Sequence, residues 1–411
     1  MKFPIFISLY FCAAVGLSAL DWPTYGGFSR DHRSVEKKLQ LDWHEEPQIL
    51  WEKNVGLGYS SVIDVSGYAY TQGYEKNFNT LYCIDTATGE TIWMHKYPSD
   101  LGDKYFQGGS RSTPTVYRGT LYLQGHGGEL FALDARSGNL IWSRHLVKDF
   151  DGIRPTWGYA GAPLVLEEKI IVQTGSPKGS LLALNRFTGS KIWHNGSAGA
   201  GYASPYPRKS APAQIVVFNQ RGLSIHHIGD GDEILHYPHV TRYEVNAAQP
   251  LDLGNEILVA SAYGKGAALV NLQDREPKSI WESDSISCQM ASLVYQDGYA
   301  FGIHGQTGTR ANQATLFCLD LKSGKKVWEE KGFGVGTLIL VNRTLVVLSD
   351  RGELAFLKAD SSEFHEINRF QVLSGKDNWI PPSYANGRLH CRSSKGQWVC
   401  LDLTDKQKAK E

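Results

Sequence analysis

An arginine among small hydroxyl residues is the side chain whose chemistry most suggests a binding site. Arg111 lies in the run Ser110-Arg111-Ser112-Thr113, whose small neighbours leave space around it. A guanidinium binds a carboxylate through two parallel hydrogen bonds, so Arg111 could hold an acidic group of a ligand. The alternative is that Arg111 pairs with a neighbouring structural unit of the protein.

Aromatic and amide side chains occupy comparable segments elsewhere, each ahead of a predicted strand pair. The candidates are Tyr59, Trp157, Tyr159, Tyr202, Asn246, Gln289 and Trp379. The rings could stack on a planar ligand, or they could close a channel as packing groups. The two amides could donate hydrogen bonds to ligand oxygens, or they could serve only the protein's own backbone.

Signatures of catalysis are missing from the sequence. It contains no Gly-x-Ser-x-Gly motif, no paired-carboxylate signature of an acid–base catalyst and no Cys-x-x-Cys spacing. The aspartates that recur most regularly, Asp85, Asp134, Asp320 and Asp402, stand where a turn begins, and their side chains suit that role. We therefore predict no catalytic residue and no metal ligand.

A repeat organises the elements that must position these candidates. The stretch 132–142 reads Ala-Leu-Asp-Ala-Arg-Ser-Gly-Asn-Leu-Ile-Trp, and three more copies keep its spacing of small residue, Asp or Asn, Gly and Trp. Those copies end at Trp93, Trp193 and Trp328. Each predicts a hairpin, because Asp or Asn starts a turn and Gly supplies its positive φ. The tryptophans suit packing between neighbouring units.

Tight turns between apolar runs mark eight such units. The turns fall at 66–67, 118–119, 167–168, 220–222, 254–255, 297–298, 342–343 and 386–387. A lone last strand, 49–53, begins the series, and a matching first half, 398–402, ends it. Joining the two closes a ring and pairs both sheet edges. We therefore predict an all-β, eight-bladed propeller of four-stranded antiparallel blades, in which the candidate residues surround the axis.

The predicted domain organisation is simple. Residues 1–19 read as a signal peptide, with Lys2 ahead of an apolar centre, although an uncleaved anchor is an alternative. Residues 20–48 form a turn-rich lead-in that lies on the ring, 49–403 form the propeller, and 404–411 form a disordered tail. The chain has 42 basic and 42 acidic residues among 411, and this balance gives no indication of nucleic-acid binding.

Cysteines give one further expectation. Cys83, Cys318 and Cys400 occupy the small-residue position of the repeat and are explained as buried packing groups. If Lys395-Gly396 forms a two-residue turn, Cys391 and Cys400 lie opposite each other and a disulfide is an open alternative.

The repeat resembles the tryptophan-docking motif of the pyrroloquinoline-quinone (PQQ) repeat family, and the resemblance covers nearly all of the predicted mature chain. The lead-in, with Trp22-Pro23, Tyr25, Gly27 and Arg30-Asp31, resembles that of secreted bacterial members. The resemblance implies an eight-bladed propeller and two functional classes. Quinoprotein dehydrogenases hold the quinone on the axis with calcium and a catalytic Asp, whereas the scaffold propeller of outer-membrane protein assembly has no enzymatic activity.

The sequence departs from both classes. The dehydrogenases carry adjacent cysteines, calcium ligands and insertions that build a lid, and none of these features can be matched in this sequence. The assembly scaffold resembles a lipoprotein, whereas Cys12 here lacks the small residues that precede a lipoprotein cysteine. We expect an exported, periplasmic or extracellular monomer that is soluble after cleavage and binds a protein partner or small ligand at one propeller face. The alternative is a PQQ- and calcium-dependent alcohol or sugar dehydrogenase. A carboxylate cluster in an axial cavity would favour the enzyme, and a plugged axis with an apolar rim would favour the scaffold.

Overall fold

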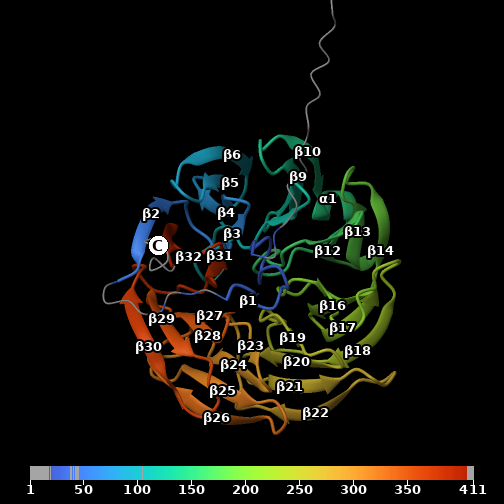
Figure 1. Ribbon diagram of the computed structural model, residues 1–411. Coiled ribbons are helices and arrows are strands. Elements are labelled where there is room, and N and C mark those ends of the chain that lie inside the picture. The colour runs from blue at the N-terminus through green and yellow to red at the C-terminus, as the bar shows by residue number, and fades with distance from the viewer. Residues whose placement is uncertain are drawn as a thin grey trace, which may run out of the picture.

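Eight β-sheets surround a central axis in the computed structural model, which describes residues 18, 20–37, 39, 41, 46–103 and 105–404. The chain passes around the ring once, from blue to red in Figure 1. The prediction of an eight-bladed propeller is confirmed. The predicted signal peptide apart from Ser18, and the predicted tail apart from Thr404, lie outside the described residues.

Blades one to four each run from an innermost strand at the axis to an outermost strand at the rim. Blade one contains β3 (Ile63–Val65), β4 (Tyr68–Glu75), β5 (Phe78–Asp85) and β6 (Thr91–Pro98). Blade two contains β7 (Thr115–Tyr117), β8 (Thr120–Gln124), β9 (Glu129–Asp134) and β10 (Leu140–His145). Blade three contains β11 (Leu164–Leu166), β12 (Lys169–Ser176), β13 (Gly179–Asn185) and β14 (Lys191–Asn195). Blade four contains β15 (Tyr206–Pro207), β16 (Gln214–Asn219), β17 (Gly222–His227) and β18 (Glu233–Pro238).

Blades five to eight complete the ring. Blade five contains β19 (Leu251–Asp252), β20 (Glu256–Ser261), β21 (Gly266–Asn271) and β22 (Lys278–Ser283). Blade six contains β23 (Val294–Gln296), β24 (Tyr299–His304), β25 (Thr315–Asp320) and β26 (Lys325–Glu330). Blade seven contains β27 (Thr337–Val341), β28 (Thr344–Leu348), β29 (Glu353–Lys358) and β30 (Glu366–Gln371). Blade eight contains β31 (Ser383–Ala385), β32 (Arg388–Arg392), β33 (Gln397–Asp402) and β2 (Gln48–Asn54).

Pairing of the two ends of the propeller closes the ring as predicted. Strand β2 pairs antiparallel with β33, and Trp51 lies opposite Cys400. A buried contact of 3.0 Å between His390 Nε2 and an Asp64 carboxylate oxygen links blade eight to blade one near the axis. The closing blade is thus held at its outer strand and at its inner strands.

The repeated tryptophans dock onto the following blade, which explains the Gly of the motif. In blade two, the Trp142 indole N–H donates to the Arg186 carbonyl at 2.8 Å. A Cβ on Gly189 would lie 2.9 Å from that ring, so only glycine fits beneath it. The same indole-to-carbonyl bond is made by Trp51, Trp93, Trp193, Trp281 and Trp328. The predicted packing of tryptophans between neighbouring units is confirmed, and it extends to Trp51 of blade eight and Trp281 of blade five.

Small residues lie opposite the tryptophans across the ladder. Cys83 faces Trp93 and Cys318 faces Trp328, so these thiols serve as small packing groups. The suggested disulfide is wrong. Cys391 pairs with Val399, whereas Cys400 pairs with His390, so the two thiols point to opposite faces of the sheet and both are free. The hairpin turn is longer than the two residues that the suggestion required.

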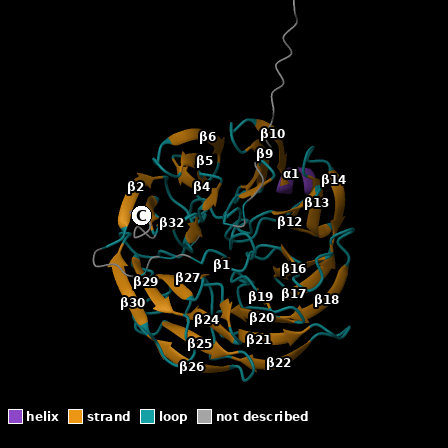
Figure 2. Cartoon of the chain, in the orientation of Figure 1, coloured by secondary structure: helices purple, strands orange, loops and turns teal. Residues whose placement is uncertain are grey.

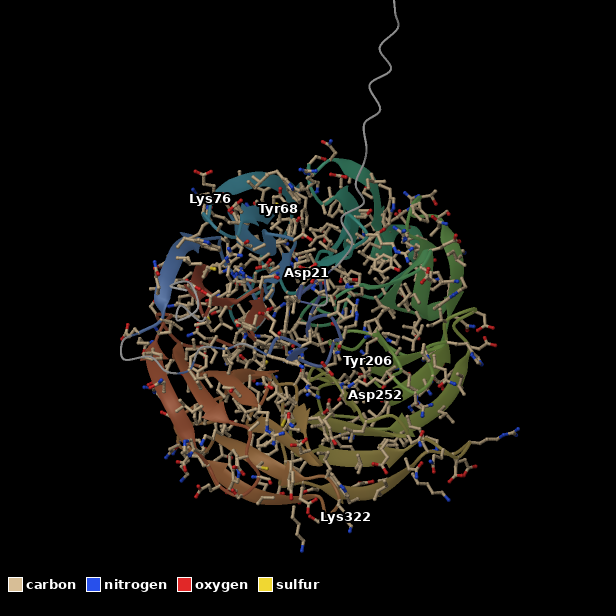
Figure 3. The ribbon with its side chains drawn as sticks, in the orientation of Figure 1. Asp21, Tyr68, Lys76, Tyr206, Asp252 and Lys322 are labelled. Atoms are coloured by element: carbon tan, nitrogen blue, oxygen red, sulfur yellow. The ribbon has the colours of Figure 1, made fainter. Side chains whose placement is uncertain are left out.

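The lead-in crosses the axis on one face of the ring, where it is dark blue in Figure 1. It bonds to blade one through the Trp22 N–H and the Asp64 carbonyl, and to blade two through the Pro23 carbonyl and the Val116 N–H. Strand β1 (Arg33–Ser34) then pairs in parallel with β27 on the far side. Asp21 of the lead-in is labelled near the centre of Figure 3, with Tyr206 and Asp252 from the innermost strands of blades four and five.

Helical structure is limited to one short element among the described residues. Helix α1 (Leu146–Phe150) lies between β10 and the third blade, and it is the purple element of Figure 2. In the described part of the chain no helix has the length and apolar character needed to cross a membrane.

Candidate functional site

An axial cavity of about 170 Å³ lies where the chain enters the innermost strands. Its walls combine aromatic rings, small residues and one arginine. The lining residues are Tyr25, Tyr59, Phe106, Arg111, Thr113, Trp157, Ala160, Tyr202, Ser204, Val245, Ala247, Tyr263, Gln289, Met290, Thr307, Trp379 and Pro381. Tyr25 belongs to the lead-in, so the segment that crosses the axis on one face of the ring also contributes to the cavity wall.

Six of the eight predicted residues line this cavity. They are Tyr59, Arg111, Trp157, Tyr202, Gln289 and Trp379, contributed by six different segments and brought together by the ring. Whether they bind a ligand stays a prediction. The structure therefore brings together most of the candidate set, although those segments are far apart in the sequence.

Tyr159 and Asn246 do not line the cavity, so their prediction as axial residues is wrong. Tyr159 is buried, and its hydroxyl donates to the Thr174 carbonyl at 2.8 Å. The intervening Gly158 has a φ of 81°, and this turn separates the directions of Trp157 and Tyr159. The Asn246 amide donates to the carbonyls of Asn219 and His239 and accepts from Ser261, so all its bonding serves the backbone and core.

Arg111 is a cation with little compensation from the protein. One terminal nitrogen donates to the Gly102 carbonyl at 3.2 Å, whereas its buried Nε has no partner. Its guanidinium lies 5.4 Å from the centre of the Tyr59 ring. Burial lowers the pKa of Arg111 below its usual range. No ion pair to Arg111 is found within the described ranges, so the predicted alternative of an inter-blade ion pair is not what the structure contains.

The aromatic walls form two groups. Tyr59 and Trp379 stack with ring centres 5.7 Å apart and planes inclined by 13°. Trp157 meets Tyr202 edge to face at 5.9 Å, and the buried indole N–H of Trp157 has no acceptor. The cavity therefore has largely apolar walls, and two of its lining residues, Arg111 and Trp157, each keep one buried donor without a partner.

Gln289 lines the cavity, but its amide is already engaged. Its nitrogen donates to the Tyr263 hydroxyl at 2.8 Å, and its oxygen accepts from the Thr307 backbone N–H at 2.7 Å. Gln289 thus orients Tyr263 and leaves little hydrogen-bonding capacity for a ligand.

Three aromatic wall residues were missed by sequence reasoning because they lie outside the segments that enter the innermost strands. Tyr25 comes from the lead-in, Tyr263 from the β20–β21 turn and Phe106 from the loop between β6 and β7. The length of that loop, residues 99–114, is a usable signal, because loops of this length are uncommon between strands.

The lining does not fit a calcium ion. Calcium requires several oxygen ligands, usually including carboxylates, and none of the described cavity residues is Asp or Glu. Nor does the described part of the chain contain a group of three or more His, Cys, Asp or Glu residues suited to a metal. Arg154 and Asp100 lie outside the lining, and Arg154 bonds both oxygens of Asp100 at 2.7 and 2.9 Å.

A closed ring of eight blades with docking tryptophans and an axial cavity defines a PQQ-like propeller. The chain belongs to the family whose model is described as outer membrane protein assembly factor BamB, and this model matches residues 45–151 and 77–330. BamB of Shewanella oneidensis is 24% identical over 425 residues, which cover 95% of this chain and 98% of that protein.

Quinone-dependent enzymes are also similar to the chain. The dehydrogenase subunit of the quinone alcohol dehydrogenase of Gluconobacter oxydans is 26% identical over 190 residues, covering 42% of this chain and 24% of that protein. The chain thus matches about a quarter of the length of such enzymes. The structure of a europium-containing methanol dehydrogenase superposes with a TM-score of 0.68 at 10% identity, covering 93% of this chain and 90% of that one, a likeness of fold alone.

Proposed function

We propose that the protein is a non-enzymatic binding or scaffold propeller that receives a protein partner or small ligand at the axial mouth. The observation that carries the proposal is the cavity lining, which combines aromatic faces with an uncompensated arginine and, within the described residues, has no carboxylate. Such a lining favours recognition, because none of its described residues is a carboxylate or a histidine, the side chains that most often transfer protons in catalysis. The match to BamB along nearly the whole chain supports the same class.

The second candidate is a quinone-dependent dehydrogenase. The stacked aromatic walls and the similarity to quinone alcohol dehydrogenases favour it. The missing calcium ligands argue against it. Export to the periplasm, predicted from residues 1–19, is part of our proposal and agrees with the description of the family as an outer membrane assembly factor.

Reconstitution separates the two candidates. The purified protein is incubated with PQQ and calcium chloride, passed through gel filtration, and assayed for dye reduction with alcohols and sugars. We expect no quinone absorbance in the protein peak and no substrate-dependent dye reduction. Retained quinone together with calcium-dependent turnover would make the protein an enzyme.

Site-specific photo-crosslinking tests partner binding in the native host. A photoreactive residue replaces Phe106, at the cavity, or Ile192, which is exposed on the outer strand β14 as a matched control. We expect discrete protein adducts from position 106 and none from position 192. Adducts from position 192 alone would mean that partners use the blade edge and not the axial mouth.

A further inference from the structure

The axial mouth continues into an exposed aromatic rim. Tyr105 is 74% exposed and its ring lies 6.3 Å from that of Trp157. Phe106 is 39% exposed and its ring lies 6.3 Å from that of Trp379. On the other side, Tyr243 is 48% exposed and meets Tyr263 edge to face at 4.9 Å. Each exposed ring thus contacts a wall ring, and apolar surface extends from the rim into the cavity.

The size of the cavity indicates what enters it. Pockets for free drug-sized ligands usually measure about 300–1,000 Å³, whereas this cavity measures about 170 Å³. A cavity smaller than those pockets, surrounded by exposed aromatic residues, suits one anchoring residue of a larger partner. Protein interfaces concentrate binding energy in such anchors, with the surrounding residues excluding water.

The charge of the cavity indicates the chemistry of the anchor. Arg111 carries a positive charge whose Nε is buried without a partner, and the Trp157 indole N–H is a second unused donor. A buried cation without a counter-ion is costly, so an anion at this place would be favoured.

We propose that the axial cavity binds the C-terminal residue of an extended protein segment, with the α-carboxylate on Arg111 and an aromatic side chain between the rings of the cavity wall. One terminal aromatic residue supplies both the charge and the ring that the lining complements. The preceding residues would lie across Tyr105, Phe106 and Tyr243 on the rim. This inference rests on the proposed function, since it names the partner chemistry of the same site.

Peptide binding to the full-length protein tests the proposal. The probes are a short fluorescein-labelled peptide ending in Phe with a free carboxylate, the same peptide with a C-terminal amide, and N-acetylphenylalanine as a competitor. We expect the acid to bind about 10- to 100-fold more tightly than the amide, as the loss of a charged hydrogen-bond acceptor predicts. We also expect N-acetylphenylalanine to compete much more weakly than the unlabelled peptide, because it lacks the residues that reach the rim.

Two variants localise the carboxylate. Arg111→Gln should weaken binding of the acid about 10- to 100-fold and leave binding of the amide unchanged. Arg136→Gln removes the same charge from an exposed position in the turn between β9 and β10 and should change neither affinity. Comparison of acid and amide on the wild-type protein does not depend on the folding of any variant.

Several results would overturn the proposal. Equal affinity for acid and amide, or an Arg111→Gln variant that binds the acid normally, would remove the role of the carboxylate. Competition by N-acetylphenylalanine as strong as that of the peptide would identify a free aromatic acid, not a protein segment, as the ligand. Absence of peptide binding with persistent crosslinks at position 106 would refute this inference alone, whereas quinone turnover would refute the proposed function itself.

Discussion

Replacing Arg111 by Met should leave the folded protein as stable as wild type, or more stable by about 1–2 kcal/mol. Complete burial of a cation costs several kcal/mol, and Arg111, which is partly buried, bears a share of this cost. Against this cost the structure sets one hydrogen bond to the Gly102 carbonyl, worth about 1.5–3 kcal/mol, and a contact with the Tyr59 ring, worth about 0.5–2 kcal/mol. Methionine keeps much of the apolar stem and removes the charge, so the free energy of unfolding should not fall.

Thermal and urea unfolding of purified proteins measure this effect. For a chain of this length the gain corresponds to a rise in Tm of about 1–3 °C. Arg154→Met is the matched control, because Arg154 bonds both oxygens of Asp100 and its loss leaves that carboxylate without its main partner. The control should lose stability. If Arg111→Met lost as much stability as Arg154→Met, the charge of Arg111 would be compensated within the protein, and the argument for an anionic ligand would fail.

Three further predictions concern the ring. Gly138→Ala should lower the free energy of unfolding by about 3 kcal/mol, because the new Cβ would lie 2.6 Å from the Trp93 ring. Gly119 has a similar positive φ but open space around it, so Gly119→Ala should lower that free energy by only about 1 kcal/mol. Urea unfolding of the two variants measures the difference. Trp142→Phe should lower the free energy of unfolding by about 1 kcal/mol in chemical denaturation, because the Arg186 carbonyl loses the indole donor but keeps the Tyr122 hydroxyl at 3.2 Å. Burial lowers the pKa of His32 to about 4, so the folded state binds fewer protons than the unfolded state between that pH and about 6.5. The free energy of unfolding should therefore fall by about 2 kcal/mol through His32 as the pH is lowered from 7 to 5. This loss should be absent in the His32→Gln variant and retained in His227→Gln, a control at an exposed histidine. Equal dependence of stability on pH in all three proteins would contradict the prediction.

The ring could be predicted from the sequence because its determinants are local and repeated. A turn-forming Asp, a Gly and a Trp at fixed spacing specify one hairpin and its contact with the next blade, as Asp134, Gly138 and Trp142 illustrate. Closure of the ring could be predicted because the first repeat has only its last strand, 49–53, and the last repeat has only its first half, 398–402. Blade four was predicted less well. Its predicted turn at 220–222 falls between the second and third strands, β16 and β17, because the innermost strand β15 has only two residues and is separated from β16 by residues 208–213.

The cavity was predicted less well because the direction of a side chain in an irregular segment depends on its exact backbone. Trp157 and Tyr159 are two residues apart, yet one faces the cavity and the other packs between blades. Asn246 shows a second reason. A buried side-chain amide must satisfy its hydrogen bonds within the protein, and that of Asn246 donates to two backbone carbonyls instead of facing the cavity. The register of the β32–β33 hairpin decides how Cys391 lies relative to Cys400. It differs by one position from the register that a two-residue turn would give, and no residue pattern in the sequence specifies this difference.

The buried nitrogens without partners differ in their acid–base chemistry and in their position, and the two together single out Arg111 as the candidate for ligand binding. Both ring nitrogens of His32 and of His239 are buried without partners. Burial lowers the pKa of these residues to about 4 and about 3, so both shed their charge at neutral pH and avoid most of the cost. A guanidinium stays charged at neutral pH, so Arg111 cannot lower its cost in this way. Its charge lies in an aromatic cavity at the open end of the axis, where a bound anion would compensate what the fold itself leaves unpaired.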